Sequence, residues 1–227
     1  RDPEMSRGLG DVYKRQSFYG AKVTSVKFAS GSNCTGIGGS AFSSCSGLTA
    51  VTLPAKLTSI GDWAFEDCTK LKSITIPAGV TKIGEYAFAG CSSLTTITMS
   101  ANSKLTEIPD YFAQNCGKLT AFTVTASIKK IGTEAFSRCR SLASVTFSAN
   151  SKCSDIGDYA FAGCSALKSI KLPASVTKLE SGVFMSCIKL TEIDIEADSI
   201  DLPYCDTFAT NAYNSDEGAW WGPVSYT

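Results

Sequence analysis

The chain has 227 residues, and its 21 Lys plus Arg residues balance 21 Asp plus Glu residues, so the formal net charge is zero. This balance predicts no basic surface for nucleic acid, and no apolar run approaches the roughly 18 residues of a membrane-spanning helix. The sequence contains no histidine, which removes the commonest general base and metal ligand, together with the catalytic triads that need an imidazole. We therefore expect no enzyme, no cofactor or metal site, no nucleic-acid partner and no membrane insertion.

The first 16 residues, RDPEMSRGLGDVYKRQ, match nothing further along the chain. They lack the apolar centre and the small-residue cleavage site of a signal peptide. The run is similar to the translated adaptor or vector sequence that contaminates some metagenomic reading frames. We therefore expect residues 1–16 to be a non-native segment, and we place the first domain boundary at residue 17.

From residue 23 onward the sequence repeats. Seven copies of the pattern Ile-Gly-x-x-Ala-Phe-x-x-Cys follow one another at steps of 23 or 25 residues. After a half unit at 23–28, they begin at Ile37, Ile60, Ile83, Ile108, Ile131, Ile156 and Leu179. Both longer steps carry the same insertion, Ser-Ala-Asn-Ser-Lys, at 100–104 and 148–152. The fourth copy departs from the pattern, with Pro109 in place of Gly and Phe112-Ala113 in place of Ala-Phe.

Each unit contains the same three expected elements. Residues 71–76, LKSITI, alternate apolar and polar side chains with the period of two that is typical of a half-buried strand, and Pro77 ends that strand. A second short extended segment follows at 80–83, and then a tight turn at Gly84. The spacing of the apolar residues in 87–91 places them on one face of a short helical or 3-10 turn.

An acidic residue often begins this turn. We expect each of these carboxylates to cap the positive end of its own helical turn, rather than to hold calcium. They are Asp62, Glu85, Asp110 and Asp158.

One unit cannot bury its own Leu, Ile and Phe side chains, so the copies must stack around a continuous core. The pattern Ile-Gly-x-x-Ala-Phe-x-x-Cys-x-x-Leu-x-x-Ile-x-Ile-Pro resembles the BspA-like leucine-rich repeats of bacterial and protist surface proteins. The resemblance implies a repeat solenoid over residues 17–199, a right-handed superhelix of mainly short parallel β-strands with short helical or 3-10 turns. It also implies adhesion to host matrix or other microbes, and an extracellular or cell-surface location. Residues 200–227 leave the pattern and are expected to form an atypical C-terminal cap or a truncated end.

Ten cysteines are present, and none forms the C-x-x-C pair typical of a metal site. Seven close the repeats; parallel copies point their Cβ atoms the same way, whereas a disulfide needs these atoms to converge. We predict free, buried thiols that fill the space under each turn, at Cys45, Cys68, Cys91, Cys116, Cys139, Cys164 and Cys187. Cys34 and Cys153 share a different position, which Leu105 also occupies, and Cys205 has no assigned role.

The outward positions of the main strands form two neighbouring files. We predict that they make a binding face of Ala50, Thr52, Ser73, Thr75, Thr96, Thr98, Ala121, Thr123, Ser144, Thr146, Ser169 and Lys171. Threonine also suits exposed strand positions for structural reasons alone. Trp220 and Trp221 are a secondary candidate for a sugar or protein contact, or part of a cap on the last repeat.

These features predict a non-enzymatic leucine-rich repeat scaffold for protein–protein recognition, in cell-surface or secreted adhesion, with a protein ligand such as a host matrix protein. Two alternatives stay open. One is a carbohydrate- or ice-binding surface module, although ice-binding solenoids repeat a Thr-x-Thr pair in every coil, and in the two outward files here only Thr96 and Thr98 form one. The other is a passive spacer for a further domain. A glycan partner is therefore also possible on sequence grounds.

Overall fold

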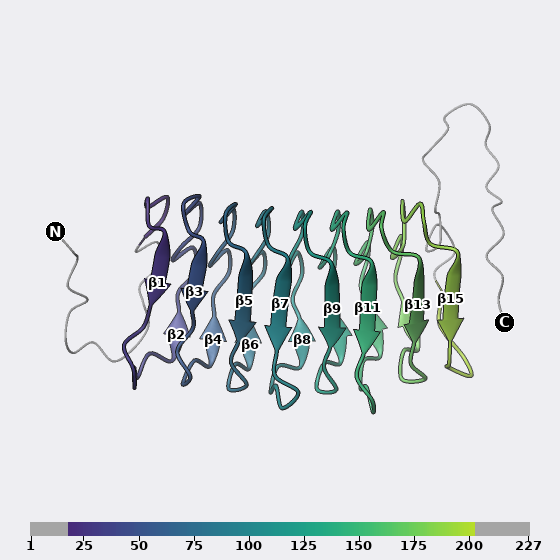
Figure 1. Ribbon diagram of the computed structural model, residues 1–227. Helices are drawn as coiled ribbons and strands as arrows, with labels where there is room; N and C mark the ends of the chain where they lie inside the picture. The colour runs from purple at the N-terminus through teal and green to yellow at the C-terminus, as the bar shows by residue number, and fades with distance from the viewer. Residues whose placement is uncertain (1–17, 203–227) are drawn as a thin grey trace.

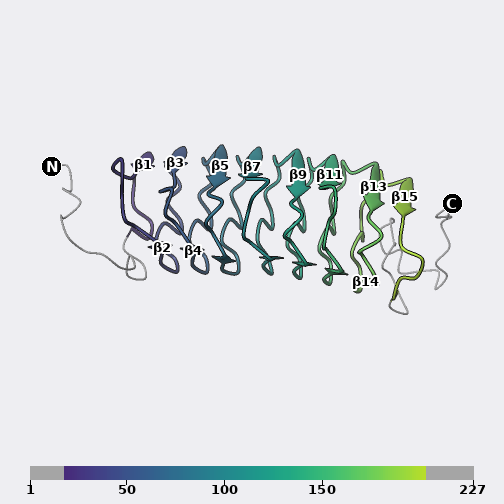
Figure 2. The same cartoon turned by 90° about the horizontal axis from the view of Figure 1, so that it is seen from below.

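The computed structural model of the protein describes residues 18–202, in which 15 short strands form a solenoid of stacked coils (Figure 1). One wall, called here the front wall, takes the odd-numbered strands, and the opposite rear wall takes the even-numbered ones (Figures 1 and 2). The strands of the two walls run in opposite directions (Figure 1). The predicted solenoid of short parallel strands is confirmed.

Each coil contributes one longer and one shorter strand. The front wall consists of β1 (Ser25–Lys27), β3 (Ala50–Thr52), β5 (Ser73–Ile76), β7 (Thr96–Met99), β9 (Ala121–Val124), β11 (Ser144–Phe147), β13 (Ser169–Leu172) and β15 (Glu192–Ile195). The rear wall consists of β2 (Gly36–Ile37), β4 (Ser59–Ile60), β6 (Lys82–Ile83), β8 (Glu107–Ile108), β10 (Lys130–Ile131), β12 (Asp155–Ile156) and β14 (Lys178–Leu179).

Strand pairing follows the repeat, because every pair is parallel and joins neighbouring coils. The hydrogen-bonded pairs of the front wall are β1–β3, β5–β7, β9–β11 and β13–β15. The rear wall forms two sheets, β2–β4–β6 and β8–β10–β12–β14. Ser73 lies opposite Thr96, and Lys130 lies opposite Asp155 even though the 148–152 insertion separates their coils. The insertion is therefore accommodated in a loop, outside the paired walls.

The turns between the rear and front walls differ from the predicted helical or 3-10 turns, because within residues 18–202 these segments are hydrogen-bonded turns and not helices. In the second coil the left-handed φ angles of Trp63 (54°) and Asp67 (52°) interrupt a right-handed helix. The amides of Trp63, Phe65 and Asp67 donate to carbonyls of the next coil at 2.8, 2.9 and 2.8 Å. A helix would need the same donors within its own segment, so stacking between coils replaces it.

Phenylalanine rings run through the core as a stack along the solenoid axis. The Phe42–Phe65 and Phe65–Phe88 centroids lie 5.3 and 5.5 Å apart, with the planes within 11° and 3° of parallel. Beyond the fourth coil the stack resumes, with Phe136 and Phe161 5.5 Å apart. These rings are almost completely buried, and offset aromatic pairs add to the stabilisation from their buried area.

The fourth coil shows how the exchanged Phe112-Ala113 pair is tolerated. Phe112 meets the ring of Phe88 edge-on, at 5.4 Å and 83°, in place of the parallel stack. Ala113 leaves the ring position empty, and Phe122 on β9 stands where the neighbouring front-wall strands have Ile or Val. The Phe122 ring lies 4.6 Å from that of Phe136. Phe112 also lies 5.8 Å from Phe136, so the rings of Phe112 and Phe122 both pack against the stack that resumes at Phe136.

The repeat geometry continues at both ends of the described chain. Phe18 stacks on Phe42 at 5.3 Å, and its amide donates to the Ala41 carbonyl. At the other end Asp201 forms a parallel bridge with Lys178, so the rear wall reaches past residue 199, where the sequence places the boundary. The expected non-native segment 1–16, Cys205 and the secondary candidates Trp220 and Trp221 lie outside the described residues.

The stacked core makes Phe88→Ala strongly destabilising. Removal of a fully buried ring that contacts rings in both neighbouring coils should lower the free energy of unfolding by about 3–5 kcal/mol, measured by urea denaturation. Because each coil contacts only its neighbours, hydrogen exchange should also accelerate in the coils of Phe65 and Phe112. Tyr19→Ala removes a ring that is 61% exposed and serves as the control, with little expected change. Equal losses for the two variants would contradict the stacked-core interpretation.

Candidate functional site

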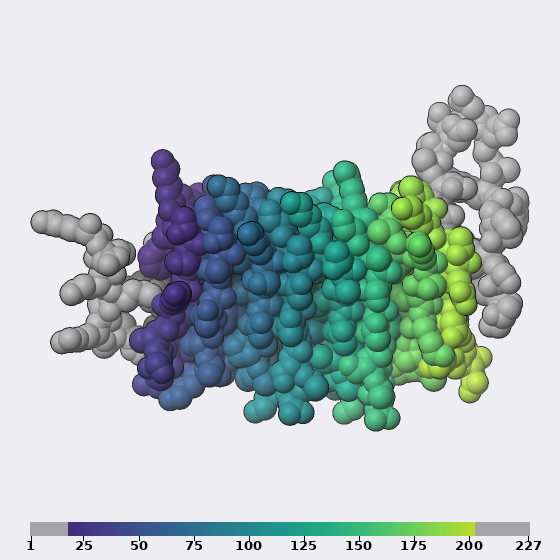
Figure 3. Space-filling view, in the orientation of Figure 1, coloured from purple at the N-terminus to yellow at the C-terminus, as the bar shows by residue number. Residues whose placement is uncertain are grey.

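All twelve predicted binding residues lie on the front wall with exposed side chains. The strand register sets them in two adjacent rows, with Ser73 opposite Thr96 and Thr75 opposite Thr98 in the hydrogen-bonded pair β5–β7. The residues between them, such as Ile74, point inward and are buried. Figure 3 views this wall face on, and its surface runs without a break from β1 to β15. The structure therefore brings the predicted residues together on one face.

The hydroxyl groups of this face differ from those of the row beside it. In that neighbouring row, Thr49 and Thr95 donate their Oγ1 hydrogens to carbonyls of the preceding coil, at 2.9 and 3.0 Å. Thr191 does the same at 3.4 Å. Within residues 18–202, by contrast, no side-chain hydrogen bond engages the nine hydroxyls of the predicted face. These hydroxyls remain available to a ligand, whereas the neighbouring row binds the coils together.

A groove of about 570 Å³ opens on the same wall between β11 and β13. These two strands are not hydrogen-bonded to each other, since β11 pairs with β9 and β13 with β15. Four predicted residues line it, namely Ser144, Thr146, Ser169 and Lys171. The remaining lining comes from other residues of β11 and β13, from Ala143, from the inserted loop 148–151, from 173–175 of the next coil, and from Glu196. The insertion thus lies beside a recess in the predicted face.

Charged groups mark the C-terminal end of the face. Lys171 Nζ lies 2.7 Å from Glu196 Oε1 and 3.0 Å from Asp194 Oδ2. The hydrogen bonds that Lys171 donates, first to Glu196 and then to Asp194, raise the pKa of Lys171 above its usual value. All three side chains are exposed, so the pairs contribute little to folding stability. They set the orientation of a cation at the rim of the groove.

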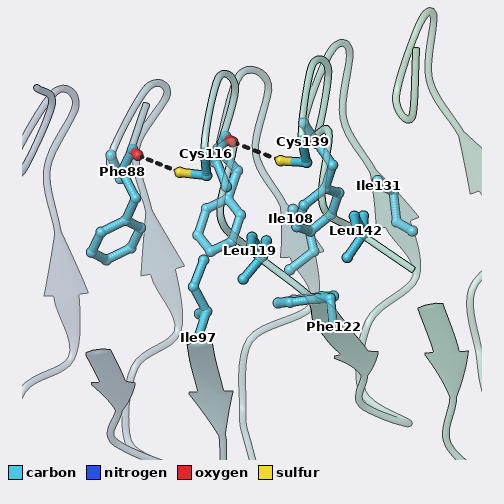
Figure 4. Close-up of a cluster of buried hydrophobic side chains, with 14 of the residues drawn as sticks. Phe88, Ile97, Ile108, Cys116, Leu119, Phe122, Ile131, Cys139 and Leu142 are labelled. Carbon is cyan, nitrogen blue, oxygen red and sulfur yellow. Dashed lines mark hydrogen bonds between the residues drawn. The ribbon is translucent and has the colours of Figure 1, made fainter. Parts of the chain in front are cut away.

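The seven repeat cysteines are free and buried, as predicted. Each thiol also donates a hydrogen bond to a carbonyl of the preceding coil, a contact that the sequence analysis missed. Cys116 Sγ lies 3.2 Å from the carbonyl oxygen of Phe88, and Cys139 Sγ lies 3.2 Å from that of Ala113. Figure 4 draws both hydrogen bonds as dashed lines. A methyl or isopropyl group could fill this space but could not donate to the carbonyl, which accounts for cysteine in all seven copies.

Burial changes the acidity of these thiols. Loss of solvation raises the pKa of Cys68 and of Cys187 to about 12. The same cause raises the pKa of Cys91, Cys116 and Cys139 well above the usual thiol value. Because the thiolate is the nucleophile and the metal ligand, the file is chemically inert in the folded protein.

Three of the four carboxylates that begin the turns bind between coils, which corrects the prediction that Asp62, Asp110 and Asp158 each cap their own turn. Asp62 Oδ1 accepts the amide of Glu85 at 3.1 Å, 23 residues further on. Asp110 accepts from Thr133 at 2.8 Å, and Asp158 Oδ1 accepts from the amide of Ser181 at 3.0 Å. The difference follows from the turn geometry, because a non-helical turn exposes its amides toward the neighbouring coil.

A row of exposed aromatic residues on the turns was also missed. Trp63 stacks on Tyr86 at 6.0 Å, and Tyr86 stacks on Tyr111 at 4.2 Å. These residues occupy the fourth position of their repeats, one of the unspecified positions of the pattern. Alignment of the copies by column would have revealed the row.

Neither a metal site nor a membrane-spanning helix is found among the described residues. Across residues 18–202, no group of three or more Cys, Asp or Glu side chains could hold a metal ion. In the same range, no helix has the length and apolar character to cross a membrane.

Comparison with known proteins agrees with this architecture. The family model described as the BspA type leucine-rich repeat region (6 copies) matches residues 13–143 and 136–213. A solved leucine-rich repeat protein of Bacteroides ovatus is 28% identical, with a TM-score of 0.64, over 83% of this chain and 54% of that one. One of Eubacterium ventriosum is 29% identical, with a TM-score of 0.65, over 74% and 44%.

The pneumococcal vaccine antigen PcpA is 26% identical, with a TM-score of 0.57, over 83% of this chain and 46% of that one. The chain thus spans about half the length of these solved relatives. No curated protein matches it.

The buried thiols should resist alkylation. Iodoacetamide at pH 8 without reductant should spare the seven repeat cysteines of the native protein and label them after denaturation, because their protons are held well above pH 8. Cys34, which is only partly buried, is the internal control and should react faster. Mass spectrometry of the peptides measures both, and disulfide-linked peptides from neighbouring coils would contradict the prediction.

The raised pKa values of these thiols predict that the folded protein loses stability at alkaline pH. Unfolded thiols titrate near 9.0, whereas burial holds the pKa of Cys68 near 12 in the folded state. Their stabilising effect is complete below pH 9 and is lost as pH rises toward 12, by up to about 1.4 kcal/mol per thiol and pH unit. The melting temperature should therefore fall between pH 9 and 11. Cys68→Ala should make that fall less steep, and an unchanged slope would contradict the assignment.

Proposed function

Because this chain belongs to the BspA-type leucine-rich repeat family, we propose that it is a non-enzymatic recognition scaffold that binds a protein ligand through its front wall. The observation that carries this proposal is the set of nine exposed hydroxyls on that wall. They lie in register on neighbouring strands, and no protein group of residues 18–202 bonds them. A face with unsatisfied donors and acceptors on a rigid support suits recognition, because little ordering is needed on binding.

The groove between β11 and β13 supplies the natural anchor point of this face. Its lining combines apolar side chains such as Ile170 and Pro173 with hydroxyls and the Lys171 ammonium group. A recess of this size accepts one or two side chains of a partner, and central buried anchors dominate protein–protein affinity. The rim carries one ammonium group and two carboxylates, so its net negative charge favours a partner with a basic side chain near the anchoring one.

We place the protein at the cell surface or outside the cell, with a host matrix protein as the expected ligand. The likeness to a solved vaccine antigen supports this location. The alternative functions, namely ice binding, carbohydrate binding and a passive spacer, predict different observations. Ice binding needs regular Thr-x-Thr pairs, and only β7 carries one. Carbohydrate binding would give a signal on a glycan array, and a passive spacer would bind no ligand at all.

Replacement of Thr75, Thr98 and Thr123 by Lys tests the face. The three side chains are exposed on adjacent front-wall strands, so the cost to folding should be a few tenths of a kcal/mol each. Binding to immobilised collagen, laminin and fibronectin, measured by biolayer interferometry, should be lost for whichever protein the wild type binds.

The matched control is the triple change of Thr81, Thr106 and Thr177 to Lys on the rear wall, which adds the same charge at exposed threonines. It should leave binding intact. Equal loss in both variants would mean that charge, and not the front wall, governs the interaction. A wild-type protein that binds none of the matrix proteins but gives a glycan-array signal would replace the protein ligand with a carbohydrate.

A further inference from the structure

The tight turns carry a row of side chains along one edge of the solenoid, at the end of the front-wall strands opposite the arrowheads in Figure 1. The row is the fourth position of each copy and consists of Ser40, Trp63, Tyr86, Tyr111, Glu134, Tyr159 and Gly182. Trp63, Tyr86 and Tyr111 form a continuous stack, and Trp63 and Tyr159 are 41% and 40% exposed. The row is an aromatic surface separate from the front wall.

Turn geometry alone does not account for aromatic residues in this row. All seven members have left-handed φ angles, between 49° and 62°. A second left-handed position lies four residues further on in every copy, and there the residues are mainly Ser, Asp, Asn and Gly. Those types tolerate this backbone region at low cost, whereas bulky side chains do not. The aromatic residues are therefore retained for what their rings contact.

Glu134 interrupts the row between Tyr111 and Tyr159. Successive coils are about 4.8 Å apart, so the two tyrosines that flank Glu134 are separated by about two such steps, or 10 Å. Tyr86 covers one face of the Tyr111 ring, and the other face is directed toward Glu134. On the far side the Tyr159 ring lies over Gly182, where a Cβ atom would approach its Cδ1 and Cε1 within 2.5 Å. Glu134 carries no ring, and this break in the row between Tyr111 and Tyr159 is called here the gap.

The Glu134 carboxylate is anchored but has no cationic partner. Its Oε2 accepts a hydrogen bond from Gln114 Nε2 at 2.6 Å. Within residues 18–202, none of the ion pairs involves it. Asp110 and Asp158 begin the turns on either side, and each uses Oδ1 for an amide of the next coil. The gap therefore combines two aromatic neighbours with uncompensated negative charge.

We propose that this gap binds the guanidinium group of an arginine side chain from a partner protein. A cation midway between Tyr111 and Tyr159 would lie about 5 Å from each, within the roughly 6 Å reach of a cation–π contact. A guanidinium is flat enough to complete the stack and can donate to Glu134 at the same time. A lysine ammonium group is a compact point charge and cannot stack, so arginine is preferred.

Fluorescence anisotropy with labelled hexa-arginine, hexa-lysine and hexa-citrulline at low salt tests the proposal. The wild type should bind hexa-arginine more tightly than hexa-lysine, and hexa-citrulline, which is planar but neutral, should not bind. Glu134→Gln should weaken hexa-arginine binding by roughly tenfold. Glu134→Tyr should do the same by filling the gap with a ring. Tyrosine already occupies this position in three copies, so this variant should fold, and its melting temperature should equal or exceed that of the wild type.

Glu107→Gln is the matched control, because it removes the same charge from the rear wall, where Glu107 makes only an exposed ion pair with Lys130. It should leave binding unchanged. A loss in this control as large as in Glu134→Gln would reveal general electrostatic attraction and overturn the proposal. Unchanged binding by Glu134→Tyr, or equal affinity for hexa-arginine and hexa-lysine, would overturn it as well.

Discussion

Hydrogen bonding between consecutive coils is the interaction on which this structure depends. Backbone amides of the strands and of the tight turns find their acceptors about one repeat away, and side chains follow the same rule. Cys91 donates its thiol hydrogen to the carbonyl of Phe65, and Asp62 accepts the amide of Glu85. A buried backbone group without a partner costs as much as a lost hydrogen bond. Each coil is therefore stable only against its neighbours, which is why the fold needs several copies.

This dependence explains where the sequence can vary. Residues that face the core must match the coils on both sides, and the exchange of Phe112 and Ala113 is accompanied by the ring of Phe122 on the front wall. The insertions at 100–104 and 148–152 occur where the chain leaves the front wall, and the register beyond 148–152 is preserved. Residue types differ most between copies at the outward positions, which stacking does not constrain.

The outward rows are also where function can be built, because the repeat aligns equivalent side chains about 5 Å apart along a rigid support. The front wall presents hydroxyls that no side-chain hydrogen bond of residues 18–202 engages, with a recess beside one insertion. The turn edge presents aromatic rings broken by one carboxylate. The zero net charge of the chain conceals this arrangement, because the distribution of charged groups among the rows, and not their sum, decides what each surface attracts.

The sequence by itself determined the coil number, the strand positions and which side chains point inward. Ile74 and Ile76 are buried and Thr75 is exposed, as their alternation requires. The same period-two logic placed the twelve candidate residues on one face. Only the tertiary structure decided what the residues at these positions contact. The turns donate hydrogen bonds to the next coil, and the Cys116 thiol donates to the Phe88 carbonyl. β11 and β13 separate into a groove, and Glu134 interrupts the row of aromatic rings. Each of these depends on a partner about 23 residues away in the chain, whose distance and orientation are properties of the stack and are not encoded in any local pattern.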